Sequence, residues 1–190
     1  IELLRINQDG AQPERNTMKA NIRLRELSSE NDYEEMAVLF TIEEDFTATA
    51  KGLQDEYEKK KDLVQVKIAE NDQGTYLGFY WIEKSLLETG RGYLYLIVKP
   101  EQRRQGTGTR LLSEAMKFAR QEKLTALRVA VRDNAPECVR FACQNGFAEI
   151  KHQISMDLDL DGFDFEAYDG IISGLKNEGF LFTSLAELGD

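Results

Sequence analysis

The sequence is poor in the side chains that bind metals or form disulfides. Its 190 residues include one histidine, His152, and two cysteines, Cys138 and Cys143. The cysteines lie five positions apart on an expected helix, so they face different sides of it and an internal disulfide is not expected. A zinc site needs a cluster of cysteines and histidines, which this sequence does not offer. We therefore expect free thiols and no bound metal.

Long apolar runs and an excess of positive charge are also missing. No run approaches the ~20 apolar residues that a membrane-spanning helix needs. Residues 1–17 lack the apolar core of a signal peptide. There are 24 lysines and arginines against 34 aspartates and glutamates, and the formal net charge of −10 argues against a nucleic-acid partner. We expect a cytoplasmic protein with neither membrane nor nucleic acid as a partner.

The sequence pattern predicts one main domain with a short segment at each end. Residues 1–17 are polar and without periodicity, so we expect a disordered leader or extension before Met18. Residues 18–159 form the main domain, since they are numerous enough for a sizeable core. The composition shifts near Asp159, and residues 160–190 are predicted to hold a helix and a strand that begin a second unit.

Alternating apolar residues predict a mixed sheet covered by helices, an α/β (α+β) fold. Helical periodicity and capping residues indicate helices near residues 28–40, 53–61, 109–121 and 135–144. A hairpin is expected where two alternating runs flank the turn sequence NDQG. Strands are predicted at 21–27, 63–70, 75–84, 93–100, 126–132 and 148–160, and in the C-terminal segment a helix at 161–180 is followed by a strand at 180–188.

A basic, glycine-containing loop stands out in this acidic chain. It follows an apolar strand and precedes an amphipathic helix, in the stretch VKPEQRRQGTGTRLLSEAMKFA that starts at Val98. Gly106 and Gly108 let the backbone approach a ligand, and the start of a helix provides unpaired amides for an anion. The Gly-Lys-Ser/Thr ending of a nucleotide P-loop and the third glycine of a dinucleotide-binding loop are both absent. The loop therefore predicts a phosphate site of another kind.

The spacing from Val98 through Pro100, Arg103 and Gly106 to Gly108 is V-x-P-x-x-R-x-x-G-x-G. It resembles the acetyl-CoA-binding motif of the GNAT N-acetyltransferase superfamily. Downstream, VAVRDNAPECVRFACQNGF is similar to the second signature of that family, and the resemblance covers about residues 20 to 158. It implies a GNAT-like, mostly antiparallel sheet flanked by helices, and an acyltransferase that uses acetyl-CoA as co-substrate.

The resemblance also implies roles for individual residues. The loop would hold the pyrophosphate, the strand before it would pair with the pantetheine arm, and Asn134 would touch that arm. An amine of a small molecule or a peptide would attack the thioester directly in a ternary complex. The expected acetyl-CoA-binding residues are Leu96, Ile97, Val98, Arg103, Arg104, Gln105, Gly106, Thr107, Gly108, Thr109, Asn134 and Phe141.

The sequence departs from the family pattern at two places. Family members often carry a tyrosine that protonates the leaving thiolate, but the corresponding positions hold Phe141 and Ala142. Many also carry a glutamate on the strand before the loop, where this chain has only Tyr93 and Tyr95 as polar groups. These two tyrosines are the candidate catalytic residues. The alternative is a structural or regulatory module that binds CoA without turnover.

Three further expectations concern other residues. His152 is expected in the core, on one strand face with Ile150 and Met156. The acids at 43–45 suit either a solvated loop or the side that receives a cationic amine. The C-terminal apolar stripe of Tyr168, Ile171, Ile172 and Leu175 needs cover, from the first unit or from a second copy in a homodimer.

Overall fold

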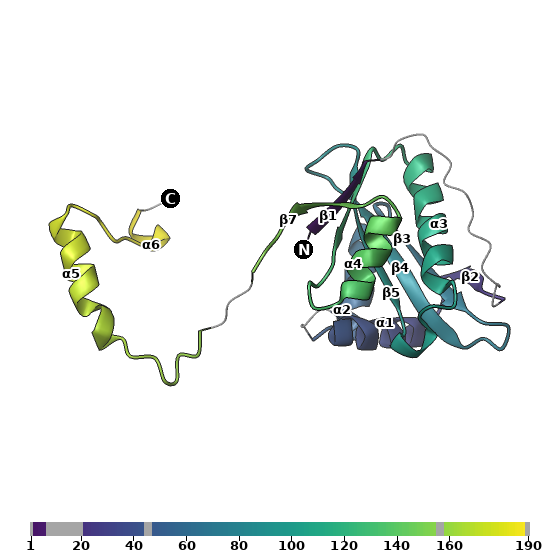
Figure 1. Ribbon diagram of the computed structural model, residues 1–190, viewed down its shortest axis with the longest axis horizontal. Coiled ribbons are helices and arrows are strands. Elements are labelled where there is room, and N and C mark those ends of the chain that lie inside the picture. The colour runs from purple at the N-terminus through teal and green to yellow at the C-terminus, as the bar shows by residue number, and fades with distance from the viewer. Residues whose placement is uncertain (1, 7–20, 44–46, 155–157, 189–190) are drawn as a thin grey trace. The chain divides into compact units, whose positions relative to one another are not determined.

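The computed structural model describes residues 2–6, 21–43, 47–154 and 158–188 (Figure 1). The chain divides into two compact units, Ile1–Gln153 and Ile154–Asp190. Among the described residues, none of the helices has the length and apolar composition of a membrane-spanning segment. Met18, Glu44, Asp45 and Met156, which entered the expectations above, lie outside the described residues.

The described residues of the first unit form a sheet of seven strands in the order β2-β3-β4-β5-β6-β1-β7. Every neighbouring pair is antiparallel except β5 and β6, which run parallel. The predicted mixed, mostly antiparallel sheet is therefore confirmed. The strands are β1 Glu2–Ile6, β2 Arg23–Glu26, β3 Val64–Glu70, β4 Tyr76–Lys84, β5 Arg91–Val98, β6 Ala126–Ala130 and β7 Ala148–Lys151.

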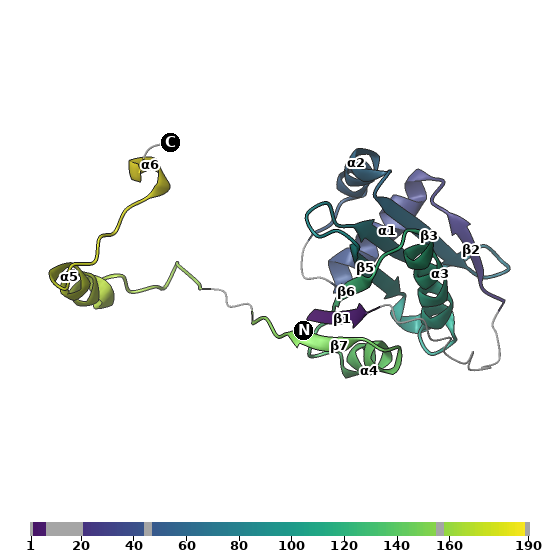
Figure 2. The same ribbon diagram turned by 90° about the horizontal axis from the view of Figure 1, so that it is seen from above.

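Helices cover both faces of the sheet, with α1 and α2 on one side and α3 on the other (Figures 1 and 2). Strand β4 illustrates that both faces of the sheet are apolar. Phe79 and Trp81 point into the cluster beneath α1 and α2, whereas Tyr80 and Ile82 point into the cluster beneath α3. The helices are α1 Glu30–Glu43, α2 Ala50–Lys60, α3 Thr107–Gln121 and α4 Pro136–Gln144, close to the predicted ranges.

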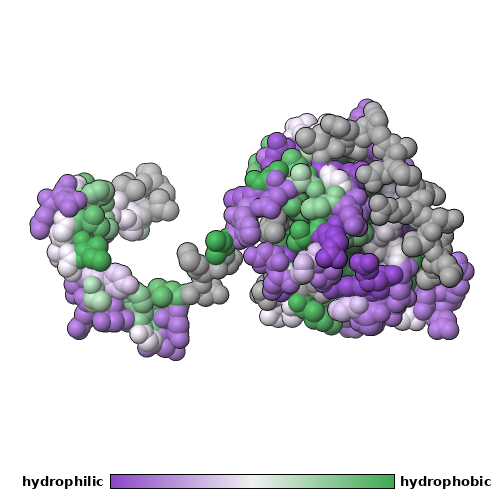
Figure 3. Space-filling view, in the orientation of Figure 1, coloured by the Kyte–Doolittle hydropathy of each residue, from purple (hydrophilic) through white to green (hydrophobic). Residues whose placement is uncertain are grey.

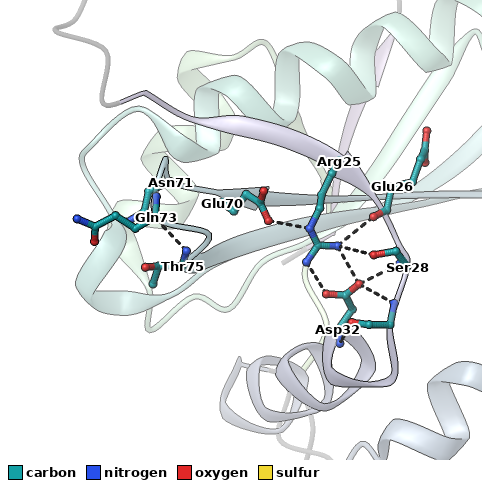
Figure 4. A network of polar contacts seen from close by, with 9 residues as sticks. Arg25, Glu26, Ser28, Asp32, Glu70, Asn71, Gln73 and Thr75 are labelled. Atoms are coloured by element: carbon teal, nitrogen blue, oxygen red, sulfur yellow. Dashed lines mark hydrogen bonds and ion pairs between the residues drawn. The ribbon is translucent and has the colours of Figure 1, made fainter.

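A buried ion pair fixes the start of α1 against the sheet (Figure 4). Arg25 of β2 donates to both carboxylate oxygens of Asp32, at 2.8 and 2.6 Å, and to Glu70 of β3 at 2.7 Å. Asp32 also accepts from the amides of Ser28 and Ser29, and the Ser29 hydroxyl accepts from the Asp32 amide, which is a capping box. Burial alone raises the pKa of the Asp32 carboxyl, but these hydrogen bonds hold it below its usual range.

Strand β1 contradicts the expected disorder of residues 1–17 over Glu2–Ile6. This segment pairs with β6 on one side and β7 on the other, and Leu3 is 1% exposed within the core. Local sequence gave no sign of it, because five residues are too few to show a period and all its partners lie far along the chain. The remainder of the expected leader, residue 1 and residues 7–17, lies outside the described residues.

The last strand of the sheet is shorter than predicted and lies at its edge. Strand β7 ends at Lys151, and all four of its residues are exposed. His152 follows it in the open, with Nε2 3.3 Å from Asp133 and Nδ1 3.7 Å from Glu149. The expectation of a core histidine is wrong, because none of the described helices buries either face of this edge strand.

The regular elements in the described part of the second unit are helices. They are the short helix η2 Glu166–Tyr168, then α5 Asp169–Asn177 and α6 Leu185–Leu188. The predicted strand at 180–188 is wrong, since α6 occupies its end and the residues before it form no regular element. Within this unit Ile171 is 57% and Phe182 55% exposed, and Figure 3 shows hydrophobic surface on it. That it begins a second domain stays a prediction.

Candidate functional site

The parallel pair at the centre of the sheet separates part of the way along. Strands β5 and β6 pair from Arg91 opposite Ala126 to Tyr93 opposite Arg128. The later residues of β5, through Val98, pair only with β4 among the described strands. Strand β5 therefore presents a free backbone edge on its β6 side.

The alternating hydrogen-bond pattern of β5 determines which residues direct their backbone amides and carbonyls to the free edge. The amide of Lys99 donates to the Leu77 carbonyl of β4 at 2.9 Å. In an antiparallel pair every second residue bonds the same neighbour, so Ile97 also bonds β4, whereas Leu96 and Val98 direct their amides and carbonyls to the free edge. The Val98 carbonyl accepts from Arg103 Nε at 3.2 Å. Ile97, expected to bind acetyl-CoA, thus has its backbone committed to β4 and its side chain 6% exposed in the core.

Close packing of β4 holds this edge in place. A Cβ on Gly78 would lie 2.3 Å from the Ile97 carbonyl oxygen, far inside van der Waals contact. Only glycine lets β4 approach β5 so closely at this point.

The free edge leads to the N-terminus of α3 through the short helix η1 Pro100–Gln102. Arg104 and Gly106 both adopt left-handed backbone angles, with φ of 64° and 91°. Gly106 is the N-cap residue and provides no side-chain cap. The first intrahelical bond is that of the Arg110 amide to the Gly106 carbonyl, so the amides of Thr107, Gly108 and Thr109 have no acceptor within the helix. This end of a 15-residue helix suits an anion.

The charged side chains of the loop have different surroundings. Arg103 reaches across to α4, where its guanidinium lies 3.6 Å from Glu137. It therefore ties the loop to both β5 and α4. Arg104 and Arg110 are exposed beside the helix start, and the side-chain Nε2 of Gln105 donates to the Glu101 carbonyl at 3.3 Å.

Helix α4 supplies the opposite wall through Phe141. Its ring lies 3.4 Å from where a Cβ on Gly108 would stand, and a Leu96 methyl lies 3.9 Å from the same point. The loop helix, the free strand edge and α4 therefore meet at Gly108. Ala142 instead is 6% exposed within the core, so only one of the two positions that lack the family hydroxyl faces this site. Asn134 lies exposed in the turn between β6 and α4.

A pocket of about 480 Å³ opens on the other face of β5, between α1, α2 and the sheet. Tyr95 lines it, with its ring 5.4 Å from that of Phe40. Tyr93 is not one of the lining residues, and its ring lies 5.9 Å from the guanidinium of Arg128 on β6. Of the two candidate catalytic tyrosines, only Tyr95 lines this pocket.

Two acids of this pocket were missed by the sequence analysis. Glu56 of α2 and Glu83 of β4 both bind Lys60, with Nζ–Oε1 distances of 2.5 and 2.9 Å. Hydrogen bonds raise the pKa of Lys60, with Glu56 contributing most and Glu83 next. The signal for Glu83 was its position two residues after Trp81, hence on the same face of β4. No three potential metal ligands gather anywhere in the described ranges.

The sequence matches the model of the Acetyltransferase (GNAT) family over residues 25–147. That range contains the free edge, the loop and α4. A comparison with curated protein sequences finds no match.

Solved structures of acetyltransferases share this fold. A ribosomal-protein-alanine N-acetyltransferase from Brucella melitensis has a TM-score of 0.59 at 18% identity, covering 68% of this chain and 86% of that one. A putative acetyltransferase from Salmonella typhimurium with its cofactor acetyl-CoA has a TM-score of 0.58 at 17% identity, covering 67% and 80%. The spermidine/spermine N-acetyltransferase from Vibrio cholerae, in mutant forms, has a TM-score of 0.58 at 18% identity, covering 70% and 83%.

Proposed function

The chain belongs to the Acetyltransferase (GNAT) family, and we propose that it transfers the acetyl group of acetyl-CoA to a primary amine of a small molecule or a peptide. The observation that carries the proposal is the free edge of β5, which ends at an uncapped helix N-terminus. The edge matches an extended arm that carries amides, and the helix end matches a pyrophosphate.

The residues that would hold acetyl-CoA follow from this geometry. The amides of Thr107, Gly108 and Thr109 face a phosphate, and exposed Arg104 adds positive charge. Leu96 offers an amide and a carbonyl to the pantetheine arm. Gly106 fits such a ligand, since no atom lies within 4 Å of the place where its Cβ would be. Bound acetyl-CoA supplies an activated acetyl group as a thioester.

The chemistry needs two proton movements and no redox step. The nitrogen lone pair of a neutral amine attacks the thioester carbonyl carbon, a C–N bond forms, and the C–S bond breaks. The sulfur leaves with the bonding electron pair and accepts a proton, while the nitrogen loses one. The products are the acetylated amine and free CoA. Tyr95 is our candidate proton donor to the sulfur, because it lies on β5 next to Leu96 and lines the pocket on the acceptor side.

A second candidate function is binding of CoA without turnover. Phe141 favours it, because it faces the site where family members often carry a tyrosine. Thiolate is nevertheless a tolerable leaving group near neutral pH, since thiols ionise near ~8.5. We therefore retain the enzyme as the leading proposal. A cytoplasmic location, where thiols stay reduced, suits a chain with only two cysteines, Cys138 and Cys143.

Calorimetry with acetyl-CoA, followed by a thiol-release assay with a panel of amines, tests both candidates. Binding and amine-dependent release of CoA are expected. Binding without release from any amine would leave the non-catalytic module as the function. Absence of binding to the full chain would contradict both.

A further inference from the structure

The pocket beside Tyr95 is lined by residues whose chemistry restricts which amine it can bind. We propose that it takes a small primary monoamine with an aromatic body, and that Lys60 excludes polyamines from it. This inference rests on the proposed transferase function and narrows its acceptor.

Three aromatic rings belong to the wall, those of Phe40, Trp81 and Tyr95. Phe40 and Tyr95 form an edge-to-face pair, and the ring of Trp81 packs at 6.1 Å and 80° against Tyr57, which does not itself line the pocket. Leu53 and Ala48 add aliphatic surface. Aromatic rings prefer such edge-to-face partners, so a planar ring is a fitting guest. A volume of about 480 Å³ lies within the range of small-molecule sites.

The charges of the pocket are already matched to one another. Its acids are Glu56 and Glu83, and the ammonium of Lys60 bonds both. A polyamine would need to displace this ammonium in order to find a carboxylate for its second cationic group. Two carboxylates and one ammonium still leave one net negative charge, which attracts an acceptor with a single ammonium.

The position of the pocket suits the reaction. Tyr95 belongs to its wall, while the next residue, Leu96, serves the free edge where the thioester arm is proposed to lie. The net negative charge favours the charged form of a bound amine, whereas the apolar part of the wall favours the neutral form. The neutral form is the one that attacks the carbonyl carbon.

Trp81 gives a binding measurement that is independent of turnover. It is the only tryptophan in the sequence, and it lines this pocket. Titration of the full chain with 2-phenylethylamine is expected to change its fluorescence in a saturable way. Ethylamine, which carries the same reactive group without the ring, is expected to bind about tenfold more weakly or worse. Equal affinity for the two amines would overturn the aromatic part of the inference.

Lys60→Met tests the exclusion of polyamines, with Lys59→Met as the matched control. Lys59 carries the same charge on the adjacent, exposed position and does not line the pocket. With saturating acetyl-CoA, Lys60→Met is expected to raise kcat/KM for spermidine about tenfold, because two carboxylates are left without a cation. Lys59→Met is expected to change it less than about twofold. Equal effects of the two variants would overturn the role of Lys60.

The outcomes separate this inference from the function beneath it. Turnover with spermidine or with a peptide, but not with 2-phenylethylamine, would confirm an acetyltransferase and reject our acceptor. Saturable binding of 2-phenylethylamine seen by Trp81, without turnover of any amine, would support the pocket and reject the transferase. Thermal unfolding of both lysine variants shows whether each is folded. A wild-type protein that acetylates spermidine in preference to 2-phenylethylamine would by itself reject the proposal that Lys60 excludes polyamines.

Discussion

Gly108 and Phe141 face each other so closely that a Cβ on the glycine would stand 3.4 Å from the phenyl ring. The two residues come from different helices, α3 and α4, and they bound the same end of the free β5 edge. The space at this end of the edge therefore depends on two features: Gly108 has no side chain, and the Phe141 ring forms the opposite wall.

Replacing Gly108 by valine is expected to lower acetyl-CoA affinity about ten- to a hundredfold, because the added methyl groups enter the space between Phe141 and Leu96. Arg104→Ala is the comparison, since this exposed arginine contributes a contact worth only about 1 kcal/mol or less, or up to about fivefold. Calorimetry measures both affinities. Similar losses in the two variants would contradict a site that depends on close backbone approach.

Phe141→Tyr is expected to raise kcat, by up to about a hundredfold if the hydroxyl protonates the leaving sulfur. The structure favours this position over Ala142, which is 6% exposed, so a tyrosine there would cost about 1–3 kcal/mol by overpacking the core. The pH dependence of kcat is the deciding measurement. A tyrosine variant that binds acetyl-CoA but shows an unchanged kcat and pH profile would place the proton donor elsewhere.

Asp32→Asn is expected to lower the free energy of unfolding at pH 7 by about 1–3 kcal/mol, because it weakens the contacts with Arg25 and the α1 cap. The native pKa of Asp32 is lowered, so its contribution is complete above the unfolded value near ~3.9 and is lost as pH falls through the native pKa. Urea titrations should thus show the largest gap between variant and parent near neutrality. Asp62→Asn, at an exposed position, serves as control, and a gap that widens in acid would reverse the assigned sign.

Leu3→Ala is expected to destabilise the first unit by about 2–5 kcal/mol, because Leu3 is 1% exposed in the core beneath α3. Leu4→Ala, on the other face of the same strand and partly exposed, should cost clearly less. Thermal unfolding compares the two. Equal and small effects would mean that β1 is not part of the stable sheet.

Truncation after Gln153 is expected to leave acetyl-CoA affinity within about threefold, because the free edge, the loop and α4 all belong to the first unit. The exposed apolar residues of the second unit, among them Ile171 and Phe182, would be removed. If they are covered by a second copy, light scattering will show a dimer for the full chain and a monomer for the truncated one. A dimer in both cases would exclude this segment as the contact.

Much of the fold could be predicted because the signals are local. Alternation gave β3 and β4 with their hairpin, and capping residues gave α1 and α4. The glycine spacing located the loop at the start of α3. The family resemblance and the mixed sheet are both confirmed.

What was missed depends on contacts between distant residues. Strand β1 is defined by partners on β6 and β7, so no window of sequence around Leu3 contains the information. Glu56 and Glu83 become one cluster only when α2 packs against β4, with Lys60 between them. The apolar alternation around His152 is real, but none of the described elements buries that edge of the sheet.

The placement of β1 has a consequence for how the chain folds. Glu2 must find Ala130 and Lys151, so the sheet cannot be completed until residues from nearly both ends of the first unit have met. Loop closure over such separations is entropically costly, and proteins rich in such contacts fold slowly. We expect the β2–β5 meander to form early and β1 to dock last. Before β1 docks, Leu3 and the edges of β6 and β7 that β1 later pairs with are uncovered. We expect this partly folded state to be the one most prone to aggregation.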